Sequence, residues 1–296
     1  MSLKNKTPKK SPRFPTRQAK IGIVGIGFVG AAVKHWFEKK KYPLFLYDKY
    51  KKIGSPQEIN KADIVFICVP TPSFRKKEGS DDSAILESLK NLSDKKIVVI
   101  KSTILPGSTE KFQKKFPQHK ILFNPEFLRE RAACEDFIHP DRQILGVTQK
   151  SKSAAEKIMN LLPKARYQKV IEVKEAEMVK YMANSFLAMK VVFGNEFYDL
   201  CQKVGIDYNG VKEGTGKDHR IGESHLDVFQ DGYRGYGGSC FPKDINAIIK
   251  FASDNKINMP LLKKIREINR WLLRKSGLSE DYFLKFLHRK KHDKKR

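Results

Sequence analysis

The sequence of 296 residues has no long apolar run, few cysteines and almost no acidic residues at its two ends. None of its apolar segments reaches the roughly 20 residues that a membrane-spanning helix needs, so we expect no membrane association. Residues 1–20 lack the apolar stretch of a secretory signal. The four cysteines are far apart and form no CxxC pair, which argues against a zinc site and a disulfide framework. These absences predict a protein of the reducing cytoplasm.

The charge is strongly unbalanced: 59 lysines and arginines against 33 aspartates and glutamates give a formal net charge of +26. Part of the excess lies in residues 4–20, which contain no acid, and in residues 285–296, which contain one. Charge runs at chain ends are usually disordered. A nucleic-acid partner or a basic cleft for anionic ligands would also explain the excess. No motif of interleaved basic and aromatic residues is present, so we expect no nucleic-acid partner.

Short apolar segments alternate with stretches of helical pattern between residues 19 and 174. This alternation predicts an α/β fold, a Rossmann-like doubly wound parallel sheet with helices on both faces. The expected strands are 21–24, 44–47, 63–69, 96–100, 120–123, 143–147 and 170–173.

The pattern changes after residue 173. Residues 175–204 are predicted to form one long helix with apolar side chains all round, and such a helix is buried. We expect this helix to form a homodimer interface, because its apolar surface needs covering. The predicted organisation is a basic disordered tail (1–18), an α/β domain (19–174), an all-helical central domain (175–275) and a basic C-terminal tail (276–296).

A glycine fingerprint follows the first expected strand. Gly25, Gly27 and Gly30 stand between this strand and a helix, and Asp48 ends the second strand. In a dinucleotide-binding turn the first glycine permits the turn, the second lets the backbone approach a pyrophosphate, and the third lets helix pack on strand. The helix N-terminus then holds the phosphates. The carboxylate of Asp48 accepts hydrogen bonds from a ribose 2′-hydroxyl and repels a 2′-phosphate, so the pattern predicts NAD.

Five further segments follow in a characteristic order: 69–72, 101–107, 124–130, 177–184 and 235–244. With the glycine fingerprint they resemble the UDP-glucose/GDP-mannose dehydrogenase family over residues 20–273. The segment with Cys240 is the most specific, because neighbouring hydroxyacid dehydrogenases lack that cysteine. The resemblance implies an NAD-dependent four-electron oxidation of a nucleotide sugar, UDP-glucose to UDP-glucuronate, through a thiohemiacetal and a thioester on Cys240.

The residues themselves support these roles. Pro242 suits the first turn of a helix, so Cys240 is expected just before a helix N-terminus, where a thiolate is stabilised and its pKa lowered. Gly235, Gly237 and Gly238 leave room for the close approach of a substrate.

Lys180 and Asn184 are spaced i, i+4 on an otherwise apolar helix and therefore project from one face. By resemblance, Lys180 steadies developing negative charge and Asn184 helps to hold a water or an oxyanion. The resemblance also implies that Asp244 lies near that lysine and the catalytic water.

The resemblance also assigns the remaining site residues. Glu126 acts as acid or base in thioester hydrolysis, Thr103 orients water or a carboxamide, Glu130 lies near the nicotinamide, and Arg220 reaches the substrate of a neighbouring subunit. The expected cofactor-binding residues are Gly25, Gly27, Phe28, Val29, Gly30, Asp48, Val69, Pro70, Thr71, Thr103 and Glu130. The expected substrate-binding residues are Glu126, Phe127, Leu128, Lys180, Asn184, Arg220, Tyr236 and Gly237.

The resemblance ends where relatives of this family continue into a third, nucleotide-binding domain. A lysine and an arginine of that domain, which hold the substrate, have no counterpart in this sequence. Two alternatives therefore stay open. A 3-hydroxyacid or 6-phosphogluconate type of dehydrogenase also has the glycine fingerprint and the Lys–Asn helix, but transfers one hydride per substrate. A truncated NAD-binding homologue with interactions through its basic surface would show no turnover.

Overall fold

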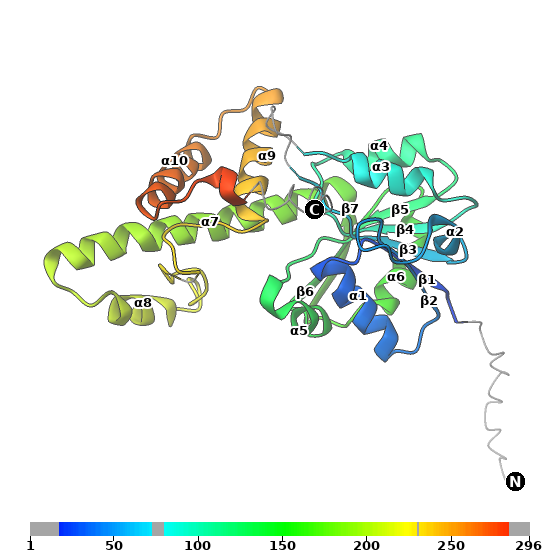
Figure 1. Ribbon diagram of the computed structural model, residues 1–296, viewed down its shortest axis with the longest axis horizontal. Helices are drawn as coiled ribbons and strands as arrows, with labels where there is room; N and C mark the ends of the chain where they lie inside the picture. Colours follow the sequence, from blue (N-terminus) through cyan, green and yellow to red (C-terminus); the bar gives the residue numbers. More distant parts are fainter. Residues whose placement is uncertain (1–17, 73–79, 230, 284–296) are drawn as a thin grey trace, which may run out of the picture.

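The computed structural model describes residues 18–72, 80–229 and 231–283 (Figure 1). Its sheet has seven strands in the order β2-β1-β3-β4-β5-β6-β7. All seven predicted strands are present, with shifts of at most three residues at their ends. They are β1 (Ile21–Val24), β2 (Leu44–Tyr47), β3 (Ile64–Ile67), β4 (Ile97–Ile100), β5 (Lys120–Phe123), β6 (Arg142–Val147) and β7 (Tyr167–Glu172). The predicted Rossmann-like fold is confirmed.

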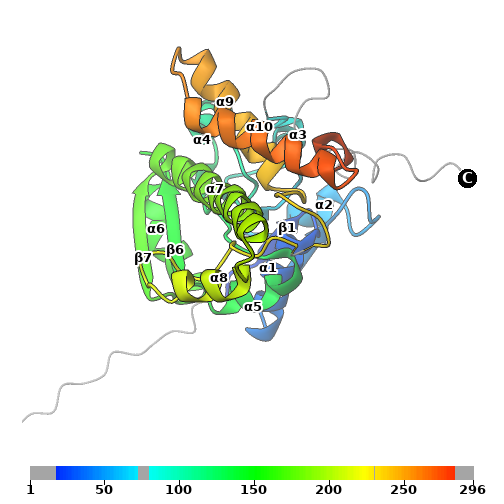
Figure 2. The ribbon, with the colours of Figure 1, turned by 90° about the vertical axis from the view of Figure 1, so that its left-hand side faces the viewer.

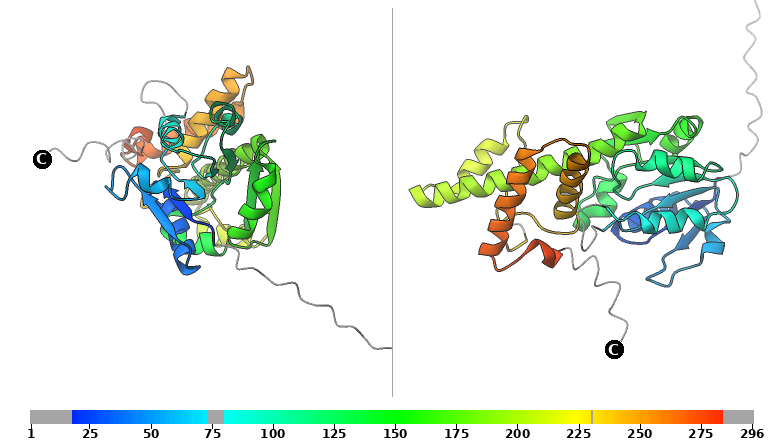
Figure 3. Two further views of the ribbon diagram at one scale, coloured as in Figure 1. Left: turned by 90° about the vertical axis from the view of Figure 1, so that its right-hand side faces the viewer. Right: turned by 90° about the horizontal axis from the view of Figure 1, so that it is seen from above.

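Helices cover both faces of the sheet, as Figures 1 and 3 show. In β3, Ile64 and Phe66 belong to the core of one face, and Val65 and Ile67 to the core of the other. Successive side chains of a strand point to opposite faces, so a strand buried on both must be apolar throughout. The first face carries α1 (Phe28–Lys39), α5 (Ala133–Ile138) and α6 (Ala155–Leu161), with the short η1 (Glu130–Ala132) and η2 (Lys152–Ala154) beside them. The second face carries α2 (Pro56–Ile59), α3 (Ser83–Lys90), α4 (Ser108–Lys115) and the start of α7 (Val173–Val204).

One strand pair departs from the predicted parallel sheet. β6 runs antiparallel to β5, with Phe123 opposite Gly146, and β7 is parallel to β6. The first residue of β6, Arg142, therefore lies at the edge where β1, β3, β4 and β5 end. The last residue of β7, Glu172, is level with Val147 and through it with Leu122, one residue from the end of β5, and α7 starts there. α7 therefore begins close to the edge at which β1, β3, β4 and β5 end.

α7 has 32 residues and is about 48 Å long. Gly146 lets its first turn approach β6, because a Cβ there would lie 2.7 Å from the Cβ of Ala176. Further along, α7 packs against α9 (Phe241–Asp254) and α10 (Pro260–Lys275), and its far end contacts α8 (Tyr208–Gly216). Figure 2 shows α9 and α10 above α7 and α8 below it. No helix in the described part of the chain is long and apolar enough to cross a membrane.

Within one chain α7 is not buried on all sides, in contrast to the prediction. One face is buried and carries polar side chains, including Lys180, Asn184 and Asn195. The opposite face is an apolar stripe whose side chains are between 41% and 73% exposed. The stripe consists of Met178, Met182, Phe186, Phe193, Phe197, Leu200 and Val204. The predicted homodimer would cover this stripe.

The chain continues to pack against the protein after α10. Glu280 accepts a hydrogen bond from Nε of Arg270 at 2.8 Å, and the ring of Phe283 lies 5.2 Å from that of Tyr233. The predicted C-terminal tail therefore does not begin at residue 276. The rest of both predicted tails, residues 1–17 and 284–296, lies outside the described residues.

Glu177 joins the start of α7 to the start of α4. Its side chain is fully buried. One carboxylate oxygen accepts hydrogen bonds from the N–H and hydroxyl of Thr109 at 2.8 and 2.7 Å, and the other accepts from the N–H of Gly107 at 2.5 Å. Burial raises the pKa of Glu177 to about 7, although these hydrogen bonds act in the opposite direction.

This carboxyl group is expected to make the stability of the protein pH-dependent. The pKa of Glu177 is raised from 4.5 to about 7 on folding, so its contribution is complete below pH 4.5 and is lost as the pH rises through 7. We expect the free energy of unfolding to fall by roughly 3 kcal/mol from this source. Urea denaturation between pH 4.5 and 8 measures the fall. Glu177→Gln should flatten the curve, whereas Glu175→Gln, at an exposed position of the same helix, should not; equal curves for all three proteins would contradict the prediction.

Candidate active site

The glycine turn after β1 has the geometry of a dinucleotide-binding turn. Gly25 has φ +86°, and a Cβ there would lie 2.8 Å from the carbonyl oxygen of Cys68. A Cβ at Gly30 would lie 1.9 Å from the carbonyl oxygen of Gly25. At Gly27, the N-cap residue of α1, no atom of the described residues comes within 4 Å of a Cβ. The first and third glycines are thus required by the fold, and the second faces open space next to a helix N-terminus.

The sheet order reverses at β1, which is flanked by β2 and β3. The loops after β1 and β3 therefore diverge, and in sheets of this kind ligands bind in the crevice between such loops, at the carboxyl ends of the strands. Phe28 and Val29 begin α1 at this edge, and Val69, Pro70 and Thr71 follow β3 there.

Asp48, at the end of β2, lies beside the glycine turn. Its carboxylate accepts hydrogen bonds from the N–H groups of Ile26, Tyr50 and Lys51 at 2.8, 3.0 and 2.9 Å. The side chain is only 9% exposed. Asp48 therefore holds the glycine turn in place.

The loops after β3 and β4 are joined by two hydrogen bonds. The hydroxyl of Thr71 donates to the carbonyl oxygen of Thr103 at 2.7 Å, and that of Ser102 donates to the carbonyl oxygen of Val69 at 2.6 Å. Thr71 and Thr103, two of the predicted site residues, are thereby held together at the crevice.

Lys180 and Glu126 form a buried ion pair at the same edge. Nζ of Lys180 lies 3.0 Å from Oε1 of Glu126 and 2.7 Å from its carbonyl oxygen. The side chains are 4% and 6% exposed. Glu126 also accepts a hydrogen bond from the N–H of Leu128 at 2.9 Å. Burial raises the pKa of Glu126, but Lys180 and this hydrogen bond outweigh it, so the pKa lies below its usual value.

A second polar pair lies on the next turn of α7. Nδ2 of Asn184 donates to Oδ2 of Asp244 at 2.6 Å, and the ammonium of Lys243 contacts the other oxygen of Asp244. Asp244 is in the first turn of α9, and Cys240 is the N-cap residue of that helix. Lys180, Lys243, Glu126 and Asp244 all act electrostatically on the Cys240 thiol. The structure therefore brings together five of the six predicted catalytic residues, and Thr103 stands on the neighbouring loop.

The thiol of Cys240 differs from the prediction in its acidity. Burial raises its pKa, and the carboxylates of Glu126 and Asp244 raise it further. The ammonium groups of Lys180 and Lys243 lower the pKa but do not outweigh these effects. The position before the α9 N-terminus was expected to give a lowered pKa. The resting protein therefore holds Cys240 as a thiol, which must lose its proton when it reacts.

The glycines before Cys240 are predicted to leave room for a substrate, but two of them are packed closely against other parts of the chain. At Gly237 a Cβ would lie 2.3 Å from the Tyr233 hydroxyl oxygen and 2.5 Å from the ring of Phe283, so these aromatic side chains fill the room expected for a substrate. Tyr236 is 3% exposed and packs in the helical core, with its N–H and C=O bonded to Asn269. Among Gly235, Gly237 and Gly238, the last alone faces space that no described residue fills.

Two predicted residues stand apart from this cluster. Glu130 is exposed at the start of η1. Arg220 is exposed on the loop after α8 and pairs with Asp218 at 2.6 Å. Lys190 anchors this loop by donating to the carbonyl oxygens of Ile221 and Gly222 at 3.0 Å. Since Lys190 is ten residues beyond Lys180, the anchor lies about 15 Å along the helix from the site.

Several residues that support the site were not among the predicted site residues. The guanidinium of Arg142 stacks on the ring of Phe127 at 3.9 Å, and Nζ of Lys180 lies 5.7 Å from the same ring. Arg234 fixes the loop before Cys240 to α7 by bonding Asn195 and Asp199. Lys101 is buried at the end of β4. A charged residue at the boundary of an apolar strand was the available signal for Arg142 and Lys101.

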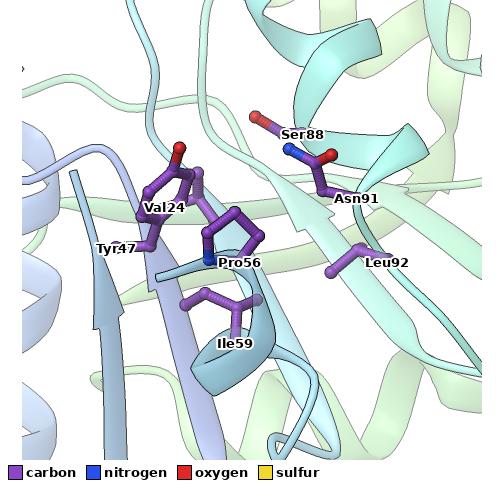
Figure 4. Close-up of a pocket in the computed structure, with 7 residues that line it drawn as sticks. All are labelled: Val24, Tyr47, Pro56, Ile59, Ser88, Asn91 and Leu92. Atoms are coloured by element: carbon purple, nitrogen blue, oxygen red, sulfur yellow. The ribbon is translucent and has the colours of Figure 1, made fainter. Parts of the chain in front are cut away.

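A small hollow lies elsewhere, between α2, α3 and the ends of β1 and β2 (Figure 4). It is lined by Val24, Tyr47, Pro56, Ile59, Ser88, Asn91 and Leu92. None of these side chains is charged, and none belongs to the cluster around Cys240.

Two models of one protein family match this chain. The model of the UDP-glucose/GDP-mannose dehydrogenase family, NAD binding domain, matches residues 47–163, and that of the same family's central domain matches residues 174–271. The glycine turn precedes the first match. The two matches adjoin near the start of α7.

Curated relatives and solved structures agree with these matches. UDP-glucose 6-dehydrogenase of Rickettsia prowazekii is 38% identical over 233 residues, 75% of this chain and 52% of the relative. A Bacillus subtilis UDP-glucose 6-dehydrogenase is 36% identical over 71% of this chain and 49% of its own length. The chain thus spans about half the length of these relatives. The structure of a UDP-glucose dehydrogenase from Pyrobaculum islandicum superposes with a TM-score of 0.78 at 28% identity, over 90% of this chain and 71% of that one.

Proposed function

Because the chain belongs to the UDP-glucose/GDP-mannose dehydrogenase family, we propose that it uses NAD to oxidise the primary alcohol of a nucleotide sugar to a carboxylate. The observation that carries this proposal is the convergence of Cys240, Lys180 and Glu126 at the crevice edge of the sheet. The names of the relatives support UDP-glucose as the sugar nucleotide.

The residues around the glycine turn fit NAD. Gly27 faces open space, and the free N–H groups of the first turn of α1 are available to a pyrophosphate. The carboxylate of Asp48 lies beside them, where it favours a ribose hydroxyl over a phosphate. When bound, NAD supplies the acceptor for the hydride that leaves the sugar.

In the first oxidation the alcohol loses a proton and a hydride. The ammonium of Lys180 and the amide of Asn184 donate to the sugar oxygen as negative charge moves through it. Asp244, held by Asn184 at 2.6 Å, takes part in positioning the water that removes the proton. The buried Glu126 keeps Lys180 protonated, since its charge raises the pKa of this lysine against the effect of burial.

The second oxidation and the hydrolysis depend on Cys240. Sγ attacks the aldehyde carbon while the thiol proton passes to the aldehyde oxygen, and the thiohemiacetal then loses its hydroxyl proton to water and a hydride to a second NAD to become a thioester. Glu126, as a carboxylate, accepts a proton from a water that Thr103 and Asp244 orient. This water attacks the thioester, releases the carboxylate product and restores the thiol. Covalent capture keeps the aldehyde in the site between the two oxidations.

The test is to mix the protein with NAD and a panel of sugar nucleotides and to follow absorbance at the nicotinamide band. We expect turnover with one class of sugar nucleotide and two NADH for each sugar consumed. One NADH for each substrate would indicate the hydroxyacid type of dehydrogenase. Absence of turnover across the panel, with salt-sensitive binding to a random DNA duplex, would indicate a non-catalytic protein.

We further propose that the stripe on α7 is the interface of a homodimer. Phe193 and Phe197 lie at its centre, with ring centroids 4.7 Å apart, and are 50% and 42% exposed. An apolar patch of this extent is typical of an association surface.

A charge in the centre of the stripe should break the dimer. We expect Phe193→Asp to raise the dissociation constant at least about thirtyfold, because an aromatic anchor is lost and a carboxylate is buried. Light scattering after gel filtration would then give the 34.1 kDa of one chain instead of twice that mass. Leu261→Asp, at a 61% exposed position of α10, is the control. A wild-type monomer, or an equal effect of both substitutions, would contradict the proposal.

A further inference from the structure

Lys101, directly after β4, is a buried lysine to which the proposed reaction assigns no part. Its side chain is 3% exposed. Nζ donates to Oδ1 of Asn124 at 2.6 Å, lies 3.4 Å from the carbonyl oxygen of Asn124, and lies 5.3 Å from the ring centroid of Phe137. A buried ammonium is costly unless an opposite charge compensates it, and neither of these partners is charged.

Asn124 forms the base of the turn that carries Glu126. Its side chain is fully buried, and Nδ2 donates to Oε1 of Gln143 at 3.1 Å and to the carbonyl oxygen of Ile144 at 2.7 Å. With Lys101 at its oxygen, the amide has a partner on each side. The turn is thus fixed at its base by Lys101 and two residues later by Lys180, which holds both the carbonyl and the carboxylate of Glu126.

Two ammonium groups therefore act on one carboxylate. Burial raises the pKa of Glu126, and both Lys180 and Lys101 lower it. Burial lowers the pKa of Lys101 to about 8; Glu126 acts to raise it and Lys180 to lower it. The other titratable groups that face Glu126 are the thiols of Cys68, after β3, and Cys240, before α9. Asp244, on α9, acts on Lys180 from the far side.

We propose that Lys101 is a positioning residue: its ammonium fixes the turn of Glu126 and supplies the second positive charge that keeps this carboxylate ionised for thioester hydrolysis. The proposal rests on the role of Glu126 in the proposed function. Lys101 itself touches neither substrate nor cofactor in this scheme. Its effect on the reaction passes through Asn124 and through the electric field at Glu126.

Two neutral variants and one matched control test the proposal. Lys101→Met removes both the charge and the hydrogen bond, whereas Lys101→Gln removes the charge and keeps a donor toward Asn124. Lys96→Met is the control: Lys96 precedes the same strand, is also buried at 8% exposure, and donates to the carbonyl oxygen of Asn60 at 2.7 Å, at the opposite edge of the sheet.

The first measurement needs no activity. In protein labelled with ¹³C at the glutamate carboxyl carbon, the signal of Glu126 is identified by its loss in Glu126→Gln, and its chemical shift is followed with pH. We expect Glu126 to titrate about one pH unit higher in both Lys101 variants than in the wild type, because a nearby opposite charge is lost. Lys96→Met should titrate like the wild type. Unchanged titration of Glu126 in Lys101→Gln overturns the proposal even if Lys101→Met does not fold.

The second measurement concerns the reaction. Quenched-flow analysis of thioester hydrolysis against pH should show the acidic limb of the profile moved upward by a similar amount in Lys101→Gln. The KM for NAD should stay within about twofold of the wild type, because the glycine turn is untouched. If Glu126 titrates at a higher pH in Lys101→Gln but the acidic limb of the pH profile for thioester hydrolysis does not move, the positioning role is overturned. If the wild type turns over no sugar nucleotide, the proposed function fails, and the NMR titration still decides whether Lys101 acts on Glu126.

Discussion

Replacement of Cys240 by alanine is expected to lower the rate of carboxylate formation by at least about 10³-fold, which is the scale of losing a catalytic nucleophile. Without the thiol there is no thioester, so oxidation stops at the aldehyde and no more than one NADH is formed for each sugar. NAD affinity should change by less than about twofold, because the glycine turn lies on a different element. Product analysis by mass spectrometry and NAD titration by fluorescence measure the two effects.

Cys134→Ala is the matched control, because Cys134 is an exposed free cysteine outside the cluster. It should leave the NADH yield at two for each sugar.

The acidity of Cys240 gives a second check. Because burial and two carboxylates raise the pKa of this thiol, its alkylation by iodoacetamide should be slow at pH 7, accelerate as the pH rises, and become faster in Asp244→Asn. An unaltered yield of two NADH in Cys240→Ala would remove the thiol from the mechanism.

Replacement of Lys180 by methionine is expected to have the largest combined effect on activity and stability. The variant leaves Glu126 buried without its partner, and breaking a buried ion pair in this way costs about 3–5 kcal/mol. Activity should also be lost, since no ammonium then faces the reacting oxygen. Urea denaturation measures the first effect and NADH formation the second.

A double variant separates the two effects. In Lys180→Met/Glu126→Leu no unpaired charge is left, so much of the lost stability should return while activity stays absent. Lys174→Met is the control on the same helix: its pair with Glu110 spans 2.9 Å, but the side chains are 59% and 43% exposed, and such pairs contribute little. If Lys180→Met were as stable as Lys174→Met, the pair with Glu126 would not be the buried contact described here.

The central strands β1, β3 and β4 were predictable because they are apolar on both faces, but the direction of β6 was not. The run from Gln143 to Val147 is equally apolar in either orientation, and side-chain periodicity contains no information on direction. The reversal arises because the connection through α5 returns to the edge of the sheet at which the chain left β5. The same limit applies to α7, where an apolar composition indicated burial, but only packing decides which side chains lie inside.

The cluster around Cys240 was predictable to a greater extent than its surroundings. Cys240, Lys180 and Glu126 were identified from their motifs, and the structure brings them together. The raised pKa of Cys240 was not predictable, because it depends on burial and on two carboxylates that meet only in the folded chain. The filling of the space at Gly237 by Phe283 likewise depends on a segment 46 residues further along the chain. Motifs therefore identified the residues of the cluster, whereas their acidity and their enclosure come from tertiary contacts.

The continuity of α7 has a consequence for changes of chain length. The buried ammonium of Lys180 and the exposed side chains from Phe186 onward belong to one helix without an internal proline. A single inserted residue between them would turn the outer half by about 100° relative to the inner half. The outer side chains would then face a new direction while the catalytic half stayed in place. Insertions or deletions in the loops around α8 leave the relative direction of the two halves of α7 unchanged. Between Lys180 and the exposed side chains, only insertions or deletions of nearly whole helical turns would do so.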